Sequence, residues 1–420
     1  MKLLNTLQSK KWTLFVIVVA IVLGCFFRLI WNEDMEWKGD EQYNFSVARA
    51  IVDQGIWPLV GQTSSFNGVS NPPFGMWIFG VLSFITPDPL SLNRAIEILN
   101  ILAILGFCLF IFLRVEESQR ELWLWGMALM AVNPLAILFS RKLWIQDLLP
   151  FFCLLMIFSH TFRQHRLGAL LWGFFGALLG QIHMLGFIYT FSIWFFTVLY
   201  DFFILRQKST RLGYWFLGTF LGCISLIPWM LRLILQTNTF SAQISSPHNF
   251  YALWLLEALG FQQEYSLGAI FTPLFYKEPI FFGQATYGVQ FLRYYLAFVG
   301  CISMIGLGVK IFSWLKKGSL WDSLKHITLV DFYVISLLCF YGGILTVLGI
   351  SMRDHYMIFV FPFSSLFLVR CLFPMRRLLM SVVICHSILS GLFLSFIHSH
   401  QDLSGSDYGV TYRQQMEIKK

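Results

Sequence analysis

Long apolar stretches, separated by short polar joints, fill most of this chain. Stretches long enough to cross a bilayer begin near Trp12, Arg94, Leu122, Leu148, Leu167, Phe187, Leu212, Phe291, Thr328, Tyr356 and Leu378. A membrane-spanning helix needs about 20 predominantly apolar residues. The pattern therefore predicts an all-α polytopic membrane protein with about 11 transmembrane helices.

One apolar run is too short for this pattern. Residues 74–85 offer only about a dozen positions, which suits a helix lying in the membrane surface better than a crossing. Counting it as a crossing would also move the next four basic joints to the opposite side of the membrane. We therefore expect an outer-surface juxtamembrane helix within the first external loop, residues 32–93.

Basic residues supply the orientation of the helices. The 420 residues carry a formal net charge of +8, and their Lys and Arg fall mostly in short joints between apolar runs. These joints are residues 114–120, 163–166, 206–211, 310–325 and 376–377. Cytoplasmic loops are enriched in Lys and Arg, so a cytoplasmic N-terminus places all of these joints inside. The charge thus reflects topology, and we expect no nucleic-acid partner.

Composition excludes a soluble domain, since 57% of the residues are hydrophobic and 12% charged. The eight cysteines lie in or beside apolar segments without metal-ligand spacing, so no metal centre is predicted from them. No cofactor is predicted with certainty, and a divalent cation stays open. We expect one transmembrane domain over residues 1–400, a second large external loop at 235–290 and a mobile polar tail at 401–420.

Two adjacent acids, Asp40 and Glu41, follow the first predicted crossing, and the apolar spacing over residues 41–56 predicts a helix lying on the membrane surface. A carboxylate held near lipid is expensive and chemically useful. An Asp just before a helix is also a common N-cap, which is the simpler interpretation of Asp40. Asn71 and the proline pair that follows it predict a rigid entry into the next helix.

Further polar residues lie at the outer ends of later helices. Arg141 and Lys142 come just before Asp147, which opens the next helix. Asp147 is either a helix-start carboxylate favoured by the dipole or a second acid beside the first loop, with Arg141 or Lys142 facing a lipid phosphate. His183 is either a satisfied interior histidine or a site residue. Arg353, His355 and Tyr356 concentrate phosphate-binding side chains, or they belong to a solvated loop.

In order and sidedness, these pieces resemble the GT-C superfamily of glycosyltransferases that use lipid-phosphate sugars. The nearest resemblance is to the glycosyltransferase family 39-like branch, which includes protein O-mannosyltransferases and the lipid A aminoarabinose transferase. The matching residues are Gly39-Asp40-Glu41, Asn71-Pro72-Pro73, Asn93-Arg94, Ser140-Arg141, Asp147, Gln181-Ile182-His183, and Arg353 to Tyr356 with Pro362. The likeness is densest from Asp40 to His183. One departure is Asn71, where the aminoarabinose transferase has a lysine.

The resemblance implies that Asp40 is the catalytic carboxylate, with Glu41 beside it and Asp147 as a second acid, and that Arg353 and its neighbours hold the lipid phosphate. It implies a polyprenyl-phosphate sugar as donor, a lipid, glycan or protein as acceptor, and inverting transfer with Asp40 as general base. The expected place is the cell membrane, a bacterial inner membrane, with the site on the outer face among membrane lipids.

Two other classes stay open. A transporter or flippase for lipid-linked sugars would explain the spans and the outer charges. Transporters normally place coupling acids near the bilayer midplane, and few ionisable residues fall there in this chain. A structural or assembly subunit is the third class, and it would be favoured if Asp40 and Asp147 lay far apart.

Overall fold

The computed structural model describes residues 2–62, 70–207, 209–235, 250–260, 284–316, 324–350, 352, 354–399 and 408–418. Regular structure in these ranges is helical, apart from isolated bridge residues, among them the antiparallel bridge between Glu36 and Thr411. The elements are α1 (Lys2–Leu29), η1 (Asn32–Asp34), α2 (Gly39–Gln54), α3 (Phe74–Ser83), α4 (Pro89–Arg114), α5 (Glu117–Val132), α6 (Pro134–Leu138), η2 (Ile145–Leu148), α7 (Leu149–His160), α8 (Arg166–Ile182), α9 (Leu185–Val198), η3 (Leu199–Ile204), α10 (Leu212–Cys223), η4 (Ile224–Leu226), α11 (Ile227–Leu235), α12 (Phe250–Ala258), α15 (Gln284–Lys316), α17 (Leu329–Ile335), η5 (Ser336–Tyr341), α18 (Gly342–Val347), η6 (Asp354–Val360), α19 (Phe363–Leu372), α20 (Arg376–Ser399) and α21 (Tyr412–Ile418).

The predicted all-α membrane class is confirmed by these helices. Seven segments in the described part are long and apolar enough to cross a membrane. They are Lys11–Leu29, Pro89–Arg114, Leu185–Ile204, Leu212–Ile234, Phe291–Val309, Leu329–Val347 and Arg376–Ser399. The other four predicted crossings coincide with the shorter helices α5, α7, α8 and α19. The short run after the proline pair is the 10-residue helix α3, as its length predicted.

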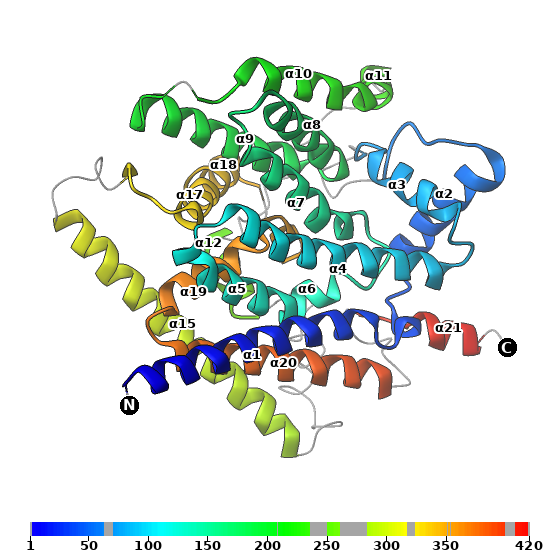
Figure 1. Ribbon diagram of the computed structural model, residues 1–420. Helices are drawn as coiled ribbons and strands as arrows, with labels where there is room; N and C mark the ends of the chain where they lie inside the picture. Colours follow the sequence, from blue (N-terminus) through cyan, green and yellow to red (C-terminus); the bar gives the residue numbers. More distant parts are fainter. Residues whose placement is uncertain are drawn as a thin grey trace.

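The helices form a bundle in which neighbours along the chain are often neighbours in space (Figure 1). Helix α1 packs on α5 and α20, while α4 packs on α5 and α7, and α8 lies between α7 and α10. Apolar side chains that face a partner helix are buried, whereas Phe15 and Val22 on α1 and Leu109 on α4 stay exposed on the outside of the bundle. Exposed apolar surface of this kind is what lipid covers in a membrane protein.

Four of the five basic joints lie together at one end of the bundle, as the charge pattern predicted, while residues 317–323 of the fifth lie outside the described residues. Arg114 donates through Nη2 to the backbone oxygen of Thr161 over 2.8 Å. The Arg211 N–H donates to the backbone oxygen of Arg163 over 3.0 Å. Arg376 pairs with Glu121 over 2.6 Å, which brings the last joint to the same end. One end of the bundle is therefore the basic one.

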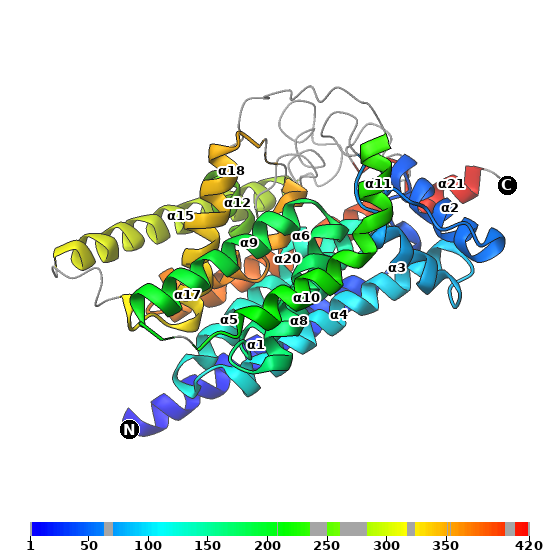
Figure 2. The same cartoon turned by 90° about the horizontal axis from the view of Figure 1, so that it is seen from above.

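The opposite end carries the first loop, residues 32–93, and the last described segment. Figure 2 shows α2, α3 and α21 together at the end away from the N-terminus. The N–H of Tyr412 donates to the backbone oxygen of Met35 over 3.0 Å, so residues 408–418 are docked on the first loop. The predicted mobility of the tail is therefore wrong for these residues. Their position agrees with an even number of crossings between the first loop and the tail.

Helix α12 departs from the expectation for the second external loop. From the sequence, residues 250–259 of that loop form an amphipathic piece that we expect to lie on the membrane, but Leu253, Trp254 and Glu257 are buried in the bundle. The ring of Phe250 packs 5.5 Å from that of Tyr341, inside the α17–α18 crossing. We also expect the loop at 235–290 to gate access to the site; most of it lies outside the described residues, so this role stays a prediction.

Close packing of α8 on α10 depends on glycine. A Cβ at Gly218 would lie 1.9 Å from the backbone oxygen of Leu170, and a Cβ at Gly173 would lie 2.1 Å from that of Trp215. Small residues at such crossings let two membrane helices approach backbone to backbone. No side chain at these two positions fits without moving the helices.

We expect Gly218→Ala to destabilise the fold by about 1–3 kcal/mol, because the added methyl meets a backbone atom that cannot turn away. The matched control is Gly213→Ala in the same helix, where a Cβ meets nothing within 4 Å. Thermal unfolding in detergent compares the two. Equal melting temperatures for both variants would contradict this packing argument.

Candidate functional site

A buried lysine is at the centre of the candidate site. The Lys142 ammonium lies 2.9 Å from Glu36 Oε2, and both side chains are only 1% exposed. Lys38 pairs with the other oxygen of the same carboxylate over 2.8 Å. The Lys142 ammonium also lies 3.6 Å from the ring centroid of Trp144, a cation–π distance. Two positive groups thus share one buried carboxylate.

Local sequence explains how Lys142 reaches this position. Asn133 ends α5 and caps α6, since its Oδ1 accepts the N–H groups of Leu135 and Ala136. The chain then turns before it can start another helix, and Lys142 lies in this turn. Asn44 on α2 donates through Nδ2 to the backbone oxygen of Leu143 over 2.7 Å. That bond ties α2 to the turn that carries the lysine.

The two adjacent acids of the first loop have different surroundings. Glu41 is 1% exposed, and its Oε2 accepts the backbone N–H of Lys38 over 2.9 Å, so it is Glu41 that caps α2. Asp40 is exposed in the first turn of α2, where the helix dipole favours a carboxylate. Partial burial of the carboxyl raises the pKa of Asp40, while the charge of Lys142 lowers it. The capping interpretation therefore fits Glu41, and Asp40 stays accessible.

Glu41 should make stability depend on pH. Burial and the charge of Glu36 raise the pKa of Glu41 to about 7. A carboxyl whose pKa is higher in the folded state binds more protons there, so the unfolding free energy falls as pH rises from about 4.5 to about 7, by at most about 1.4 kcal/mol per pH unit.

We expect Glu41→Gln to flatten this fall, because glutamine keeps an oxygen for the Lys38 N–H and has no proton to lose. Melting temperatures at pH 5 and pH 8, for wild type and variant, measure the effect. A wild type that is equally stable at both pH values would contradict it. Asp40 is shifted in the same direction, so some pH dependence is expected to persist in the variant.

Asp147 lies in η2, at the start of the helical segment that continues as α7. Its side chain is fully buried, and neither carboxylate oxygen has a hydrogen-bond partner within the described ranges. The charges of Lys142, Glu41 and Glu36 act on it. Asn100 donates to its backbone oxygen over 2.9 Å, which fixes the turn. Asp147 and Asp40 thus come from separate segments and share Lys142 as a charged neighbour.

Aromatic and histidine side chains border this group of charges. The ring of His355 lies 5.6 Å from Trp144 and 4.3 Å from Tyr356. The ring of Tyr356 in turn lies 5.2 Å from that of His183. Burial lowers the pKa of His183 to about 4, so this ring is neutral at pH 7. The structure therefore places His355 next to Trp144, and Tyr356 and His183 follow it in a chain of neighbouring rings.

Arg141 does not fit its predicted role. Its guanidinium is buried and donates to the backbone oxygens of Phe27, Ile30 and Trp31, the last over 2.9 Å. Phe27 and Ile30 lie at the end of α1, where backbone oxygens lack helical partners, and a cation there is favourable because of the helix dipole. Arg141 thus stabilises the end of α1 instead of facing a lipid phosphate. The phosphate contact predicted for Arg353 lies outside the described residues.

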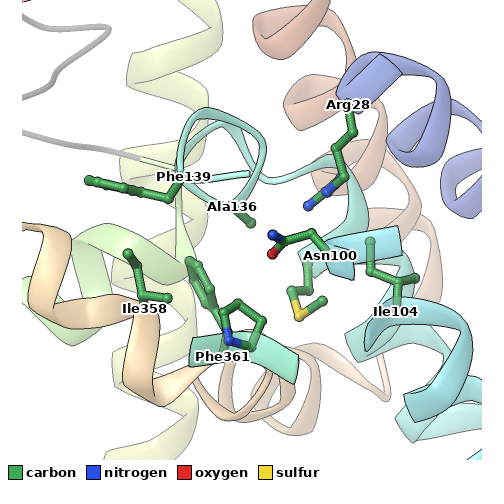
Figure 3. A pocket seen from close by; sticks show the side chains of 9 residues that line it. Arg28, Asn100, Ile104, Ala136, Phe139, Ile358 and Phe361 are labelled. Carbon is green, nitrogen blue, oxygen red and sulfur yellow. The ribbon is translucent and has the colours of Figure 1, made fainter. Parts of the chain in front are cut away.

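A small cavity lies beside this region, between α1, α4 and η6. Arg28, Asn100, Ile104, Ala136, Phe139, Ile358 and Phe361 are among its lining residues. In Figure 3 the Arg28 guanidinium and the Asn100 amide both point into the space between these side chains. Arg28 also donates to the backbone oxygens of Gly24 and Ala131, over 2.8 and 2.7 Å. The predicted acids are not among the lining residues, so this cavity is not the candidate site.

The described residues contain no group of three or more His, Cys, Asp or Glu that could hold a metal ion. Among the acids near Lys142, Glu36 is paired with the ammonium groups of Lys142 and Lys38. The divalent cation that the sequence left open therefore has no ligand set in the part of the chain that the structure describes.

The chain is an all-α membrane protein in which acids and a lysine meet at the end that carries the first loop. No protein-family model matches it, and no curated protein is similar to it in sequence. The solved structures similar to it include ArnT from Cupriavidus metallidurans bound to undecaprenyl phosphate, at 13% identity and TM-score 0.48, covering 86% of this chain and 60% of ArnT. The same protein in the apo state gives 14% identity and TM-score 0.46, covering 87% of this chain and 60% of ArnT.

The oligosaccharyltransferase of Archaeoglobus fulgidus tethered to an acceptor peptide is similar at 15% identity and TM-score 0.46, covering 91% of this chain and 55% of that protein. The chain therefore spans well under two thirds of the length of these proteins.

Proposed function

We propose that this chain is a membrane glycosyltransferase that moves a sugar from a polyprenyl-phosphate donor to a hydroxyl of a lipid, glycan or protein. The observation that carries the proposal is the convergence around Lys142 of Asp40, Glu36 and Asp147, which come from two separate stretches of the chain. The order of motifs in the sequence independently points to the same class. The donor phosphate would lie at the membrane surface, so no nucleotide site is needed.

Asp40 is the proposed general base, because it is the exposed carboxylate of the group. It would take the proton of the acceptor hydroxyl as that oxygen attacks the anomeric carbon. The bond from this carbon to the phosphate oxygen breaks in the same displacement, and the configuration inverts. Polyprenyl phosphate leaves with the electron pair of that bond. A positioned base typically contributes about 10²–10⁴-fold to the rate.

Lys142 is the proposed counter-charge for the departing phosphate. It is held in place by Glu36 and lies over the Trp144 ring, in surroundings with little water. Fixed positive groups act strongly on developing charge where water is excluded. Arg353 keeps its sequence-based role as a further phosphate contact. His183, His355 and Tyr356 are proposed to border the sugar or the phosphate, because their rings continue from Trp144.

Asp147 and Glu41 are proposed to support this arrangement. Glu41 caps the helix that carries Asp40, and Asp147 adds a buried carboxyl group close to Lys142. The proposed location is the outer face of a bacterial inner membrane, where lipid-linked sugars and their acceptors meet. Orientation of one substrate in lipid and one in water would account for much of the remaining rate.

Mass spectrometry of cell-surface glycans tests the proposal in cells. We compare cells that have the chain with cells that lack it, and a third set that carries Asp40→Asn. One sugar should disappear from a defined lipid, glycan or protein in both the second and third sets, and the molecule that loses it identifies the acceptor class. Unchanged glycans without the chain would contradict transfer. Normal glycans with Asp40→Asn would remove Asp40 from the chemistry.

A further inference from the structure

Residues 408–418, called here the docked segment, lie against residues 34–37 of the first loop (Figure 1). The Tyr408 hydroxyl donates to the backbone oxygen of Asp34 over 2.7 Å. The Tyr412 N–H donates to that of Met35 over 3.0 Å, and Gln415 Nε2 donates to that of Trp37 over 2.5 Å. The docked segment therefore donates hydrogen bonds to three backbone oxygens within four residues, those of Asp34, Met35 and Trp37.

Charged side chains anchor the same contact. Arg413 Nε lies 2.9 Å from Asp34 Oδ1, and His398 Nδ1 on α20 lies 2.6 Å from Asp34 Oδ2. Arg413 also donates to the backbone oxygen of His398 over 2.6 Å. The Asp34 side chain is only 2% exposed, so these partners compensate a buried charge.

The docked segment binds residues 34–37, and within this stretch Glu36 binds Lys142. Residues 35–37 have no helix of their own, and buried backbone groups need partners. The docked segment occupies one side of the stretch, where Thr411 bridges Glu36. On the other side, the Glu36 carboxylate binds the ammonium groups of Lys142 and Lys38. Glu36 thus touches both the docked segment and the buried lysine.

We propose that the docked segment is a positioning element: it fixes Glu36, and through Glu36 it fixes the ammonium of Lys142. Its effect on sugar transfer rests on the proposed function, whereas its effect on Lys142 does not. A hydrogen-bonded stretch that loses its partner opens locally, and such opening exposes side chains that the closed form protects. Lys142 should therefore become more accessible when a substitution far from it weakens the contact between the docked segment and residues 34–37.

Tyr412→Pro is the sharpest variant. It removes the N–H that binds Met35, and position 412 is the first residue of α21, where proline is tolerated. Glu417→Gln is the matched control, since Glu417 lies exposed in the same helix. Arg413→Gln is a second variant, which breaks the pair with Asp34 and leaves the backbone unchanged. Gel filtration in detergent shows which variants fold.

The first readout is the rate at which an amine-reactive reagent labels Lys142, measured by mass spectrometry of full-length protein. We expect the labelling rate to rise about tenfold in Tyr412→Pro and by less in Arg413→Gln. Loss of a hydrogen bond of ordinary net strength makes local opening more frequent by about such a factor. Glu417→Gln should label as wild type does. An unchanged rate in folded Tyr412→Pro, or in Arg413→Gln if the proline variant does not fold, would overturn the proposal.

A double-mutant cycle with Glu36→Gln shows whether the effect passes through Glu36. If it does, Tyr412→Pro adds little to the labelling rate once Glu36 is neutral, and two effects that multiply would overturn that path. Transfer kinetics complete the test: the KM for the polyprenyl-phosphate sugar should rise more than kcat falls. If labelling changes while no sugar transfer is found in any variant, the positioning role stands and the proposed function fails.

Discussion

Replacing Asp40 by asparagine is expected to lower the rate of sugar transfer by about 10²–10⁴-fold, the range that a positioned general base contributes. Asparagine keeps the size of the side chain but cannot take a proton from the acceptor hydroxyl. Asp40 is exposed in the first turn of α2, so the variant should lose less than about 1 kcal/mol of stability, from the lost charge at the helix start. A radiolabelled lipid-linked sugar, followed in lipid nanodiscs, measures the transfer.

Asp53→Asn is the matched control for this variant. Asp53 is exposed in the last turn of the same helix, where it pairs with Arg49. It loses the same charge at the same membrane surface, so a general electrostatic effect would slow both variants. Equal slowing of Asp40→Asn and Asp53→Asn would contradict a specific role for Asp40.

Replacing Lys142 by methionine is expected to destabilise the protein by about 3 kcal/mol and to reduce transfer as well. Removal of one partner of a buried ion pair typically costs about 3–5 kcal/mol, because the other charge is left in the interior. We expect the lower end of this range, since Lys38 still binds Glu36. Thermal unfolding in detergent gives the stability, and transfer is measured below the melting temperature.

The double variant Lys142→Met with Glu36→Gln separates the two effects of Lys142. With both charges gone, no buried charge is left alone, so most of the stability should return. Lys38 is partly exposed and loses little when its partner goes. Transfer should stay low in the double variant, because the proposed counter-charge is still missing. Full recovery of transfer together with stability would show that Lys142 is only structural.

The crossings were predictable because lipid leaves the backbone few choices. A segment in hydrocarbon must satisfy its own N–H and C=O groups, so every long apolar run had to be a helix. The residues at which the crossings start were harder to predict. The crossing predicted from Tyr356 begins as α19 only at Phe363, because residues 354–360 form the tight helix η6 and Pro362 follows. Apolar sequence alone does not distinguish such a tight turn from an α-helix.

Helix α12 and the docked segment show where the same reasoning fails. Buried positions in α12 recur at Phe250, Leu253, Trp254 and Glu257, a spacing that fits a bundle interior as well as a membrane surface. Composition predicted a mobile tail over 401–420, yet residues 408–418 find hydrogen-bond partners in the first loop. Those partners lie hundreds of positions earlier in the chain, so no local signal indicates the contact.

Part of the candidate site was predictable from the sequence. Asp40, Asp147 and Lys142 stood out as charged residues at helix ends, and the structure brings them together. Glu36 was missed, because its importance depends on a lysine 106 positions away. Arg141 and Lys142 are adjacent and similar in charge, yet one serves the end of α1 and the other meets the acids. Only the path of the chain after α6 distinguishes them.

The central claim is that a carboxylate of the first loop activates an acceptor beside a polyprenyl-phosphate sugar. The most direct measurement supplies purified protein in nanodiscs with a polyprenyl-phosphate sugar labelled in the sugar, together with an extract of cell-envelope acceptors. Wild type should move the label from the lipid to an acceptor with inverted configuration, while Asp40→Asn leaves it on the lipid. Label that stays on the lipid with folded wild type, or that moves equally well with Asp40→Asn, would contradict the account.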